Sequence, residues 1–285
     1  MQKVELSHSW REEGRARYQD RDLVKHDMDK IISLVLRNCV DGDWDEDYIT
    51  RSLLSSIRDC FSEIHLEADY KLGRPSVCQI EAYKNRKTKN YEPNYGDIGI
   101  LVRLNLGNGK ILEGVALLEA KRIYTPDDGL DDVKFPYFKA LELSQLTKHV
   151  ANTSNHRTVL YDFYTKSEGS KVVYSVQTLP SQHLIVADVN DRSIYSLTED
   201  FSYCLAHRYM CGYELNYETE IVDGFKGNRG GKAATRFLLE LNFHMDEEFE
   251  RGTNAIGSGI NTDIYLPLEP GFLDVTRWYP RLKAA

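Results

Sequence analysis

The sequence predicts an α/β fold in which a mixed central sheet is flanked by helices. Residues 20–40 carry apolar side chains at helical spacing. Residues 97–123 hold two strand-like runs around a glycine-rich turn, as in a β-hairpin. A helical stretch at 136–152 precedes a strand-like run at 157–164, so helices and strands alternate along the chain.

Two helices are expected before the first strand. The first belongs to an N-terminal helical segment, residues 1–44, and Gly42 ends it. The second runs from Asp45 to about Ala68 and presents an apolar stripe to the core. A turn-like Leu-Gly-Arg-Pro-Ser segment then leads into an expected strand at 77–83.

The register of the hairpin at 97–123 decides which polar side chains share a face of the sheet. A two-residue turn would place Asp97 opposite Ala120, so that Asp97 would face away from Glu119. A three-residue loop, Gly107-Asn108-Gly109, places Asp97 opposite Glu119 instead.

The longer loop is preferred for two reasons. It sets Arg103 opposite Glu113, a pair of opposite charges across neighbouring strands. It also gives one consistently apolar face, and a buried face resists slips of register. The apolar pairs are Ile98 with Leu118, Ile100 with Ala116, and Leu104 with Leu112.

Beyond these elements the sequence predicts a strand at 183–189 and helices near 198–210 and 232–243. The expected organisation is a core at residues 45–190 followed by a C-terminal helical extension at 191–285. No internal repeat or low-complexity tract divides the chain.

The preferred register brings two carboxylates and a lysine together on one face. Asp97 and Glu119 can hold a divalent cation, and Mg²⁺ favours such oxygen ligands. Lys121, two residues beyond Glu119, can orient or deprotonate an attacking water and balance phosphate charge. A bound metal polarises a phosphoryl oxygen and lowers the pKa of its water. These residues predict phosphodiester hydrolysis with Mg²⁺, for which Mn²⁺ is expected to substitute.

Asp97, followed about twenty residues later by Glu119-Ala120-Lys121, resembles the motif of the PD-(D/E)XK nuclease superfamily. The order helix, three strands, helix, strand over residues 45–165 is similar to the core of that superfamily. The resemblance implies a restriction-endonuclease-like core with a C-terminal extension, and an Mg²⁺-dependent nuclease that cuts DNA in a restriction or antiphage role. One departure is Gly96, which stands where the family often has proline.

The resemblance implies two further site residues. Some related exonucleases carry a Q-x-x-x-Y motif on the helix after the third strand, and this chain has Gln145 with His149 in place of the tyrosine. Gln145 is therefore a candidate catalytic residue, whereas His149 is expected to be exposed. The helix before the first strand often supplies another acid. Glu67, at the edge of the apolar stripe, is preferred to Glu63 as a metal ligand.

Two basic segments are candidates for contact with nucleic-acid phosphates, although solubilising loops often have the same composition. The second precedes an expected helix, whose N-terminus favours anions, but it lacks the pattern of an NTP-binding loop. The candidate nucleic-acid-binding residues are Lys84, Arg86, Lys87 and Lys89 in the first segment and Arg229 and Lys232 in the second.

A formal net charge of −8 is unusual for a nucleic-acid-binding protein, because such proteins are usually basic. Enzymes that hold a metal with carboxylates are often exceptions, because the bound cation changes the local field. No long apolar run and no apolar N-terminal segment occur, so a cytoplasmic protein with no membrane association is expected. DNA is the expected substrate, while a helicase or ATPase partner and a homo-oligomeric state are left open. Two alternatives remain: a non-catalytic nucleic-acid-binding or scaffold subunit on a nuclease-like fold, and an unrelated α/β protein with a coincidental motif.

Overall fold

The computed structural model describes residues 11–12, 15–18, 20–69, 74–86, 96–106, 110–125, 135–138, 143–153, 155–165, 171–229, 234–245 and 259–271. Its α-helices are α1 (Arg21–Asp41), α2 (Glu46–Cys60), α3 (Leu143–Asn152), α4 (Ser181–Ala187), α5 (Phe201–Tyr203) and α6 (Thr219–Phe225). Shorter helical turns are η2 (Arg192–Leu197), η3 (Cys204–Arg208) and η4 (Tyr209–Cys211). The strands are β1 (Arg11–Glu12), β2 (Arg15–Tyr18), β3 (Glu63–Asp69), β4 (Arg74–Asn85), β5 (Ile98–Asn105), β6 (Ile111–Tyr124), β7 (Tyr137–Phe138), β8 (His156–Thr165), β9 (Val172–Pro180), β10 (Glu199–Asp200), β11 (Phe237–Met245) and β12 (Tyr265–Pro267).

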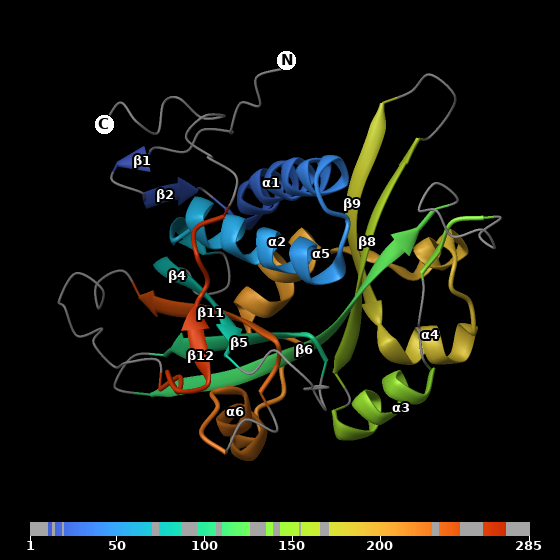
Figure 1. Ribbon diagram of the computed structural model, residues 1–285. Helices are drawn as coiled ribbons and strands as arrows, with labels where there is room; N and C mark the ends of the chain where they lie inside the picture. Colours follow the sequence, from blue (N-terminus) through green and yellow to red (C-terminus); the bar gives the residue numbers. More distant parts are fainter. Residues whose placement is uncertain are drawn as a thin grey trace.

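One mixed sheet joins the strands of the described residues (Figure 1). Its main path runs β1-β2-β3-β4-β11-β5-β6-β8-β9-β10, while β12 pairs with β4 and β7 with β6. The pairs β2–β3, β11–β5 and β6–β8 are parallel, and the remaining pairs are antiparallel. Helices flank this sheet, so the predicted α/β class with a mixed central sheet is confirmed.

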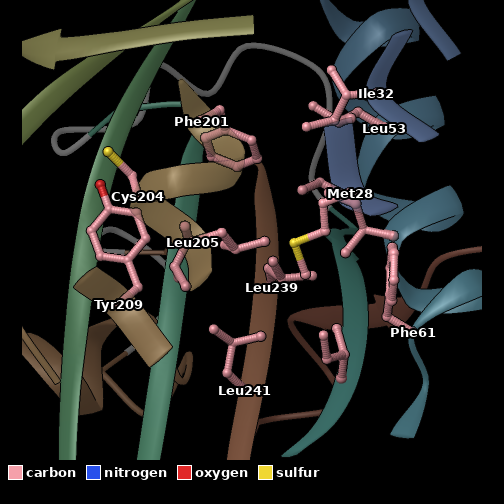
Figure 2. Close-up of a cluster of buried hydrophobic side chains, with 14 of the residues drawn as sticks. Met28, Ile32, Leu53, Phe61, Phe201, Cys204, Leu205, Tyr209, Leu239 and Leu241 are labelled. Carbon is pink, nitrogen blue, oxygen red and sulfur yellow. The ribbon is translucent and has the colours of Figure 1, made fainter. Parts of the chain in front are cut away.

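The two faces of the sheet are covered by different helices. α1, α2 and the helical segment 201–211 pack on one face, where they share a large apolar core with β11. Figure 2 shows Leu239 and Leu241 of β11 between Met28 and Phe61 on one side and Leu205 on the other. α6 packs on the opposite face against β5 and β6, and α3 and α4 cover the same face nearer β8.

The C-terminal part of the chain supplies a central strand. β11 lies between β4 and β5, antiparallel to the first and parallel to the second. The prediction of a helix at 232–243 is wrong, because residues 237–245 form a strand. Successive side chains of a strand point to opposite faces, and here Phe237, Leu239, Leu241 and Phe243 are buried on one face, while Leu238 is buried on the other.

The sheet also crosses the boundaries expected from the sequence. Strands from the segments 1–44, 45–190 and 191–285 all belong to it. The third segment is therefore more than a helical extension, because its strand β11 completes the centre of the sheet.

Three other helix and strand boundaries differ from expectation. The helix predicted over 45–68 ends at Cys60 and β3 follows, where the buried Ile64 and Leu66 alternate with polar residues. The stretch 183–189 belongs largely to helix α4 rather than to a strand, since a short apolar run does not discriminate between the two. The helix predicted at 136–152 is present from Leu143, after the short strand β7.

The register predicted for the β5–β6 hairpin is confirmed. Ile98 pairs with Leu118 and Ile100 with Ala116. Arg103 lies opposite Glu113 and donates a 2.6 Å hydrogen bond from Nε to Oε1. The turn residues 107–109 lie outside the described residues. This register fixes which side chains of the two strands share a face.

Candidate functional site

Asp97 lies directly before β5, one residue ahead of the Ile98–Leu118 pair, so it stands beside Glu119 of β6. Its Oδ2 accepts a 3.1 Å hydrogen bond from the backbone N–H of Ala120. The Asp97 carbonyl in turn accepts a 2.9 Å hydrogen bond from the N–H of Phe237 at the start of β11. Two neighbouring strands therefore hold Asp97 beside Glu119.

The backbone before Asp97 requires glycine. Gly96 has a φ of +107°, a region that side chains rarely adopt. A Cβ at this position would lie 2.5 Å from the carbonyl oxygen of Leu118. Proline, whose φ is fixed near −65°, cannot take this conformation. The glycine at position 96 therefore has a structural reason.

Lys121 connects two carboxylates. Its Nζ donates a 2.6 Å hydrogen bond to Oε1 of Glu119 and lies 3.8 Å from Oε1 of Glu46, in the first turn of α2. The other oxygen of Glu46 accepts a 3.3 Å hydrogen bond from the N–H of Arg122. Glu119 and Lys121 are 1% and 8% exposed, so the charges of this pair are screened little by solvent.

Carboxylates outnumber cations at this point. Burial and the Asp97 charge raise the pKa of Glu119 to about 8, although Lys121 lowers it. Burial also raises the pKa of Glu46 to about 7, against the opposing effect of Lys121. Burial alone lowers the pKa of Lys121, but Glu119, Glu46 and Asp97 together raise it above its ordinary value. A single ammonium does not balance three acids, so the cluster favours an additional positive charge.

The donor set fits a divalent cation. Oε2 of Glu119 is buried and accepts no hydrogen bond from the described residues. An unsatisfied buried carboxylate oxygen is costly unless a charge or hydrogen bond reaches it. Asp97 and Glu46 add oxygen donors of the kind that Mg²⁺ and Mn²⁺ bind. Within the described ranges no three His, Cys, Asp or Glu side chains are already arranged to enclose a metal, and the Lys121 ammonium lies close to both glutamates.

Two histidines and a serine form a series of contacts that begins at Glu119. Nδ1 of His149, on α3, is 3.6 Å from Oε2 of Glu119. The rings of His149 and His156 are 4.8 Å apart between centroids, and Nδ1 of His156 lies 2.8 Å from the Ser181 hydroxyl. His149 is 2% exposed, so the expectation of an exposed histidine is wrong. α3 lies against the sheet at this point, which buries the ring.

Glu67 does not join this cluster. It lies on the strand β3 rather than on a helix, and β3 is four positions away from β6 in the sheet. At a strand spacing of about 4.8 Å the separation is about 19 Å. The helix that precedes the strands instead contributes Glu46 from its first turn. Its neighbour Asp45 caps the helix, so the local sequence carried a signal for the helix start but none that singled out Glu46.

Among the remaining predicted residues, those that the structure describes form no hydrogen bond or ion pair with the acids. Gln145 is half-buried on α3, one turn before His149, and the described residues show no hydrogen bond between it and the acids. Lys84 belongs to β4 rather than to a loop. Arg86 donates to the carbonyl of Thr262, and Arg229 pairs with Glu220 on the surface. Lys87, Lys89 and Lys232 lie outside the described residues.

Comparisons with family models, with curated proteins and with solved structures found no match to this chain. Among the described helices, none is both long and apolar enough to cross a membrane. The site must therefore be interpreted from its own geometry and chemistry.

Proposed function

We propose that this chain is a divalent-metal-dependent nuclease that hydrolyses phosphodiester bonds in DNA. The observation that carries the proposal is the convergence of Asp97, Glu119 and Glu46 around Lys121, with one oxygen of Glu119 left without a hydrogen bond. The motif resembles that of the PD-(D/E)XK superfamily, and so does the order of α2, β4, β5, β6, α3 and β8, apart from the additional strands β3 after α2 and β7 before α3. This resemblance supports a restriction-endonuclease-like core and a restriction or antiphage role. The insertion of β11 between β4 and β5 is a feature that the motif did not predict.

The three carboxylates are the residues that would hold Mg²⁺ or Mn²⁺. A bound cation supplies positive charge to a phosphoryl oxygen and acidifies a bound water. Glu119 lies on β6, and Lys121 donates a hydrogen bond to one of its oxygens, so its carboxylate is fixed before any ligand binds. Asp97 is fixed by the N–H of Ala120.

Lys121 is the residue that would act on the phosphate group or on the attacking water. Hydrolysis forms a bond between a water oxygen and phosphorus, breaks one ester P–O bond, and ends with a proton on the leaving oxygen. The raised pKa of Lys121 keeps its ammonium charged at neutral pH. It therefore orients the water or stabilises charge on the phosphoryl group rather than removing a proton.

The test is cleavage of supercoiled and linear DNA by the purified protein, with Mg²⁺, with Mn²⁺ and with chelator. Metal-dependent cleavage that disappears in Glu119→Gln supports the proposal. Glu113→Gln is the matched control, because Glu113 also lies on β6 and also pairs with a buried lysine, Lys226, away from the site. Full cleavage by Glu119→Gln would refute the assignment.

The alternative is a non-catalytic nucleic-acid-binding or scaffold subunit. Retention of the complete acid and lysine set argues against it, since a decayed site is expected to lose a member. Binding of DNA in a mobility-shift assay, without cleavage in any metal, would favour this alternative.

A further inference from the structure

We infer that His149, His156 and Ser181 form a buried positioning relay that fixes the Glu119 carboxylate for metal binding. This inference rests on the proposed function and adds to it three residues outside the acid and lysine set. His149 and His156 are positioning residues, because they act through Glu119 rather than through the substrate.

The relay starts at the carboxylate. Oε1 of Glu119 is occupied by Lys121 at 2.6 Å, while Oε2 faces Nδ1 of His149 at 3.6 Å. The two contacts lie on different oxygens: the Lys121 hydrogen bond holds Oε1, and the buried His149 ring, at an ion-pair distance that is too long for a hydrogen bond, limits the positions open to Oε2. A carboxylate restricted in this way can present Oε2 to a cation without first losing side-chain freedom.

The second step fixes His149. Its ring packs on the ring of His156, with centroids 4.8 Å apart and planes inclined by 41°. His149 comes from α3 and His156 from the start of β8, so the contact joins the helix to the sheet. Both rings are buried, at 2% and 1% exposure, which limits the alternative positions they can take.

The third step connects His156, through Ser181, to β8, the strand that pairs with β6 at Glu119. Nδ1 of His156 and the hydroxyl of Thr158 each lie 2.8 Å from the hydroxyl of Ser181, at the start of α4. Thr158 is the register partner of Glu119 across the parallel pair β6–β8. Ser181 and Thr158 are fully buried, so the polar atoms of the relay are anchored at both ends to the sheet.

The test is Mn²⁺ binding to the full chain by calorimetry, with the metal-free melting temperature measured in parallel. We expect His149→Ala to weaken Mn²⁺ binding about 10–100-fold, as for other residues that orient a metal ligand. His149→Asn, whose amide can occupy the place of Nδ1, is expected to restore most of the affinity. His207→Ala is the matched control, because His207 also pairs with an acid, Asp22 at 3.1 Å, but on α1.

The outcomes separate the inference from the proposed function. Wild-type affinity in His149→Ala would overturn the relay while leaving the nuclease proposal intact. Absence of both Mn²⁺ binding and cleavage in the wild-type protein would overturn the proposed function and the relay together. If His149→Ala does not fold, Ser181→Ala decides the question. Weaker Mn²⁺ binding in that variant, with an unchanged metal-free melting temperature, supports the relay, and unchanged binding overturns it.

Discussion

Gly96 offers the sharpest test of the structure, because the nuclease motif that the sequence resembles and the observed backbone make opposite predictions for proline at this position. Gly96→Pro would restore the residue that the motif often has. The observed φ of +107° is incompatible with the proline ring, whose φ is near −65°. We therefore expect Gly96→Pro to destabilise the protein and to displace Asp97, despite completing the motif.

The magnitude follows from the geometry of the milder variant, Gly96→Ala. A side chain held at this φ costs about 1–3 kcal/mol. Its Cβ would lie 2.5 Å from the Leu118 carbonyl oxygen and 2.9 Å from the carbonyl carbon, and overpacking against fixed atoms costs about a further 1–3 kcal/mol. We expect Gly96→Ala to lose about 2–6 kcal/mol and Gly96→Pro at least as much. A shift of Asp97 by about 1 Å is expected to slow cleavage about 10²-fold.

The assay is urea unfolding followed by circular dichroism, together with single-turnover cleavage at saturating Mn²⁺. Gly42→Ala is the control, since Gly42 has a φ of −115° and its nearest Cβ neighbour, the carbonyl oxygen of Asn38, would be 3.1 Å away. The control is expected to change stability by less than about 1 kcal/mol. A Gly96→Pro variant as stable as this control would refute the conformation assigned to Gly96 and the explanation of the missing proline.

Three other predictions concern charged residues. Lys121→Ala should lower the single-turnover rate about 10²–10³-fold, far more than it changes Mn²⁺ affinity in calorimetry. Lys121→Arg should not restore the rate fully, because the guanidinium is planar and longer. An unchanged rate in Lys121→Ala would make the motif coincidental. The raised pKa of Glu119 means that the folded state holds more protons than the unfolded state between pH 4.5 and about 8, so the metal-free protein loses stability as pH rises through that window. In Glu119→Gln the melting temperature of the metal-free protein should therefore fall less with rising pH than in the wild type, and identical profiles of melting temperature against pH would contradict the assignment. Arg157→Ala should lower the free energy of unfolding by about 2–3 kcal/mol in urea, because Arg157 donates to Glu199 and Glu214 at 2.8 and 2.9 Å. Arg208 also pairs with both acids, so a loss below about 0.5 kcal/mol would show that Arg208 alone is sufficient for them.

The local part of the fold could be predicted from the sequence. The β5–β6 register follows from residues close together in the chain, above all the Arg103–Glu113 pair and the apolar partners around it. The alternative with a two-residue turn shifts the register by one residue and would have moved apolar side chains to the wrong face. The same local information placed Asp97 beside Glu119, which explains why this half of the candidate site was accessible to sequence reasoning.

The long-range part could not be predicted. β11 pairs with β4 through contacts such as Phe237 with Lys84, and nothing local indicates that such distant segments meet. The stretch was expected to be a helix, and its short apolar run did not discriminate between helix and strand or indicate a place in the sheet. Pairing partners across long sequence separations depend on the tertiary fold rather than on local pattern.

The remaining site residues were missed for two different reasons. Glu46 occupies the first turn of a helix, where acids are common because their negative charge interacts favourably with the helix dipole. Its presence there gave no specific signal of a metal ligand. Glu67 was preferred because the helix was extended past Cys60 into what is a strand. His156 and Ser181 belong to no motif. The pairing of β8 with β6 places His156 beside Leu117, and the start of α4 brings Ser181 within 2.8 Å of it.

The central position of β11 has a consequence for synthesis of the chain. β11 begins about 130 residues after β5 ends, so at about 5–20 residues per second the strand that joins β4 to β5 is made roughly 7–26 s after β5. During that interval both strands have open edges, which are templates for pairing with other chains. The N–H of Phe237 that holds the Asp97 carbonyl is also missing until then. A nascent chain that stops before β11 therefore carries the residues of the site without the strand that assembles them.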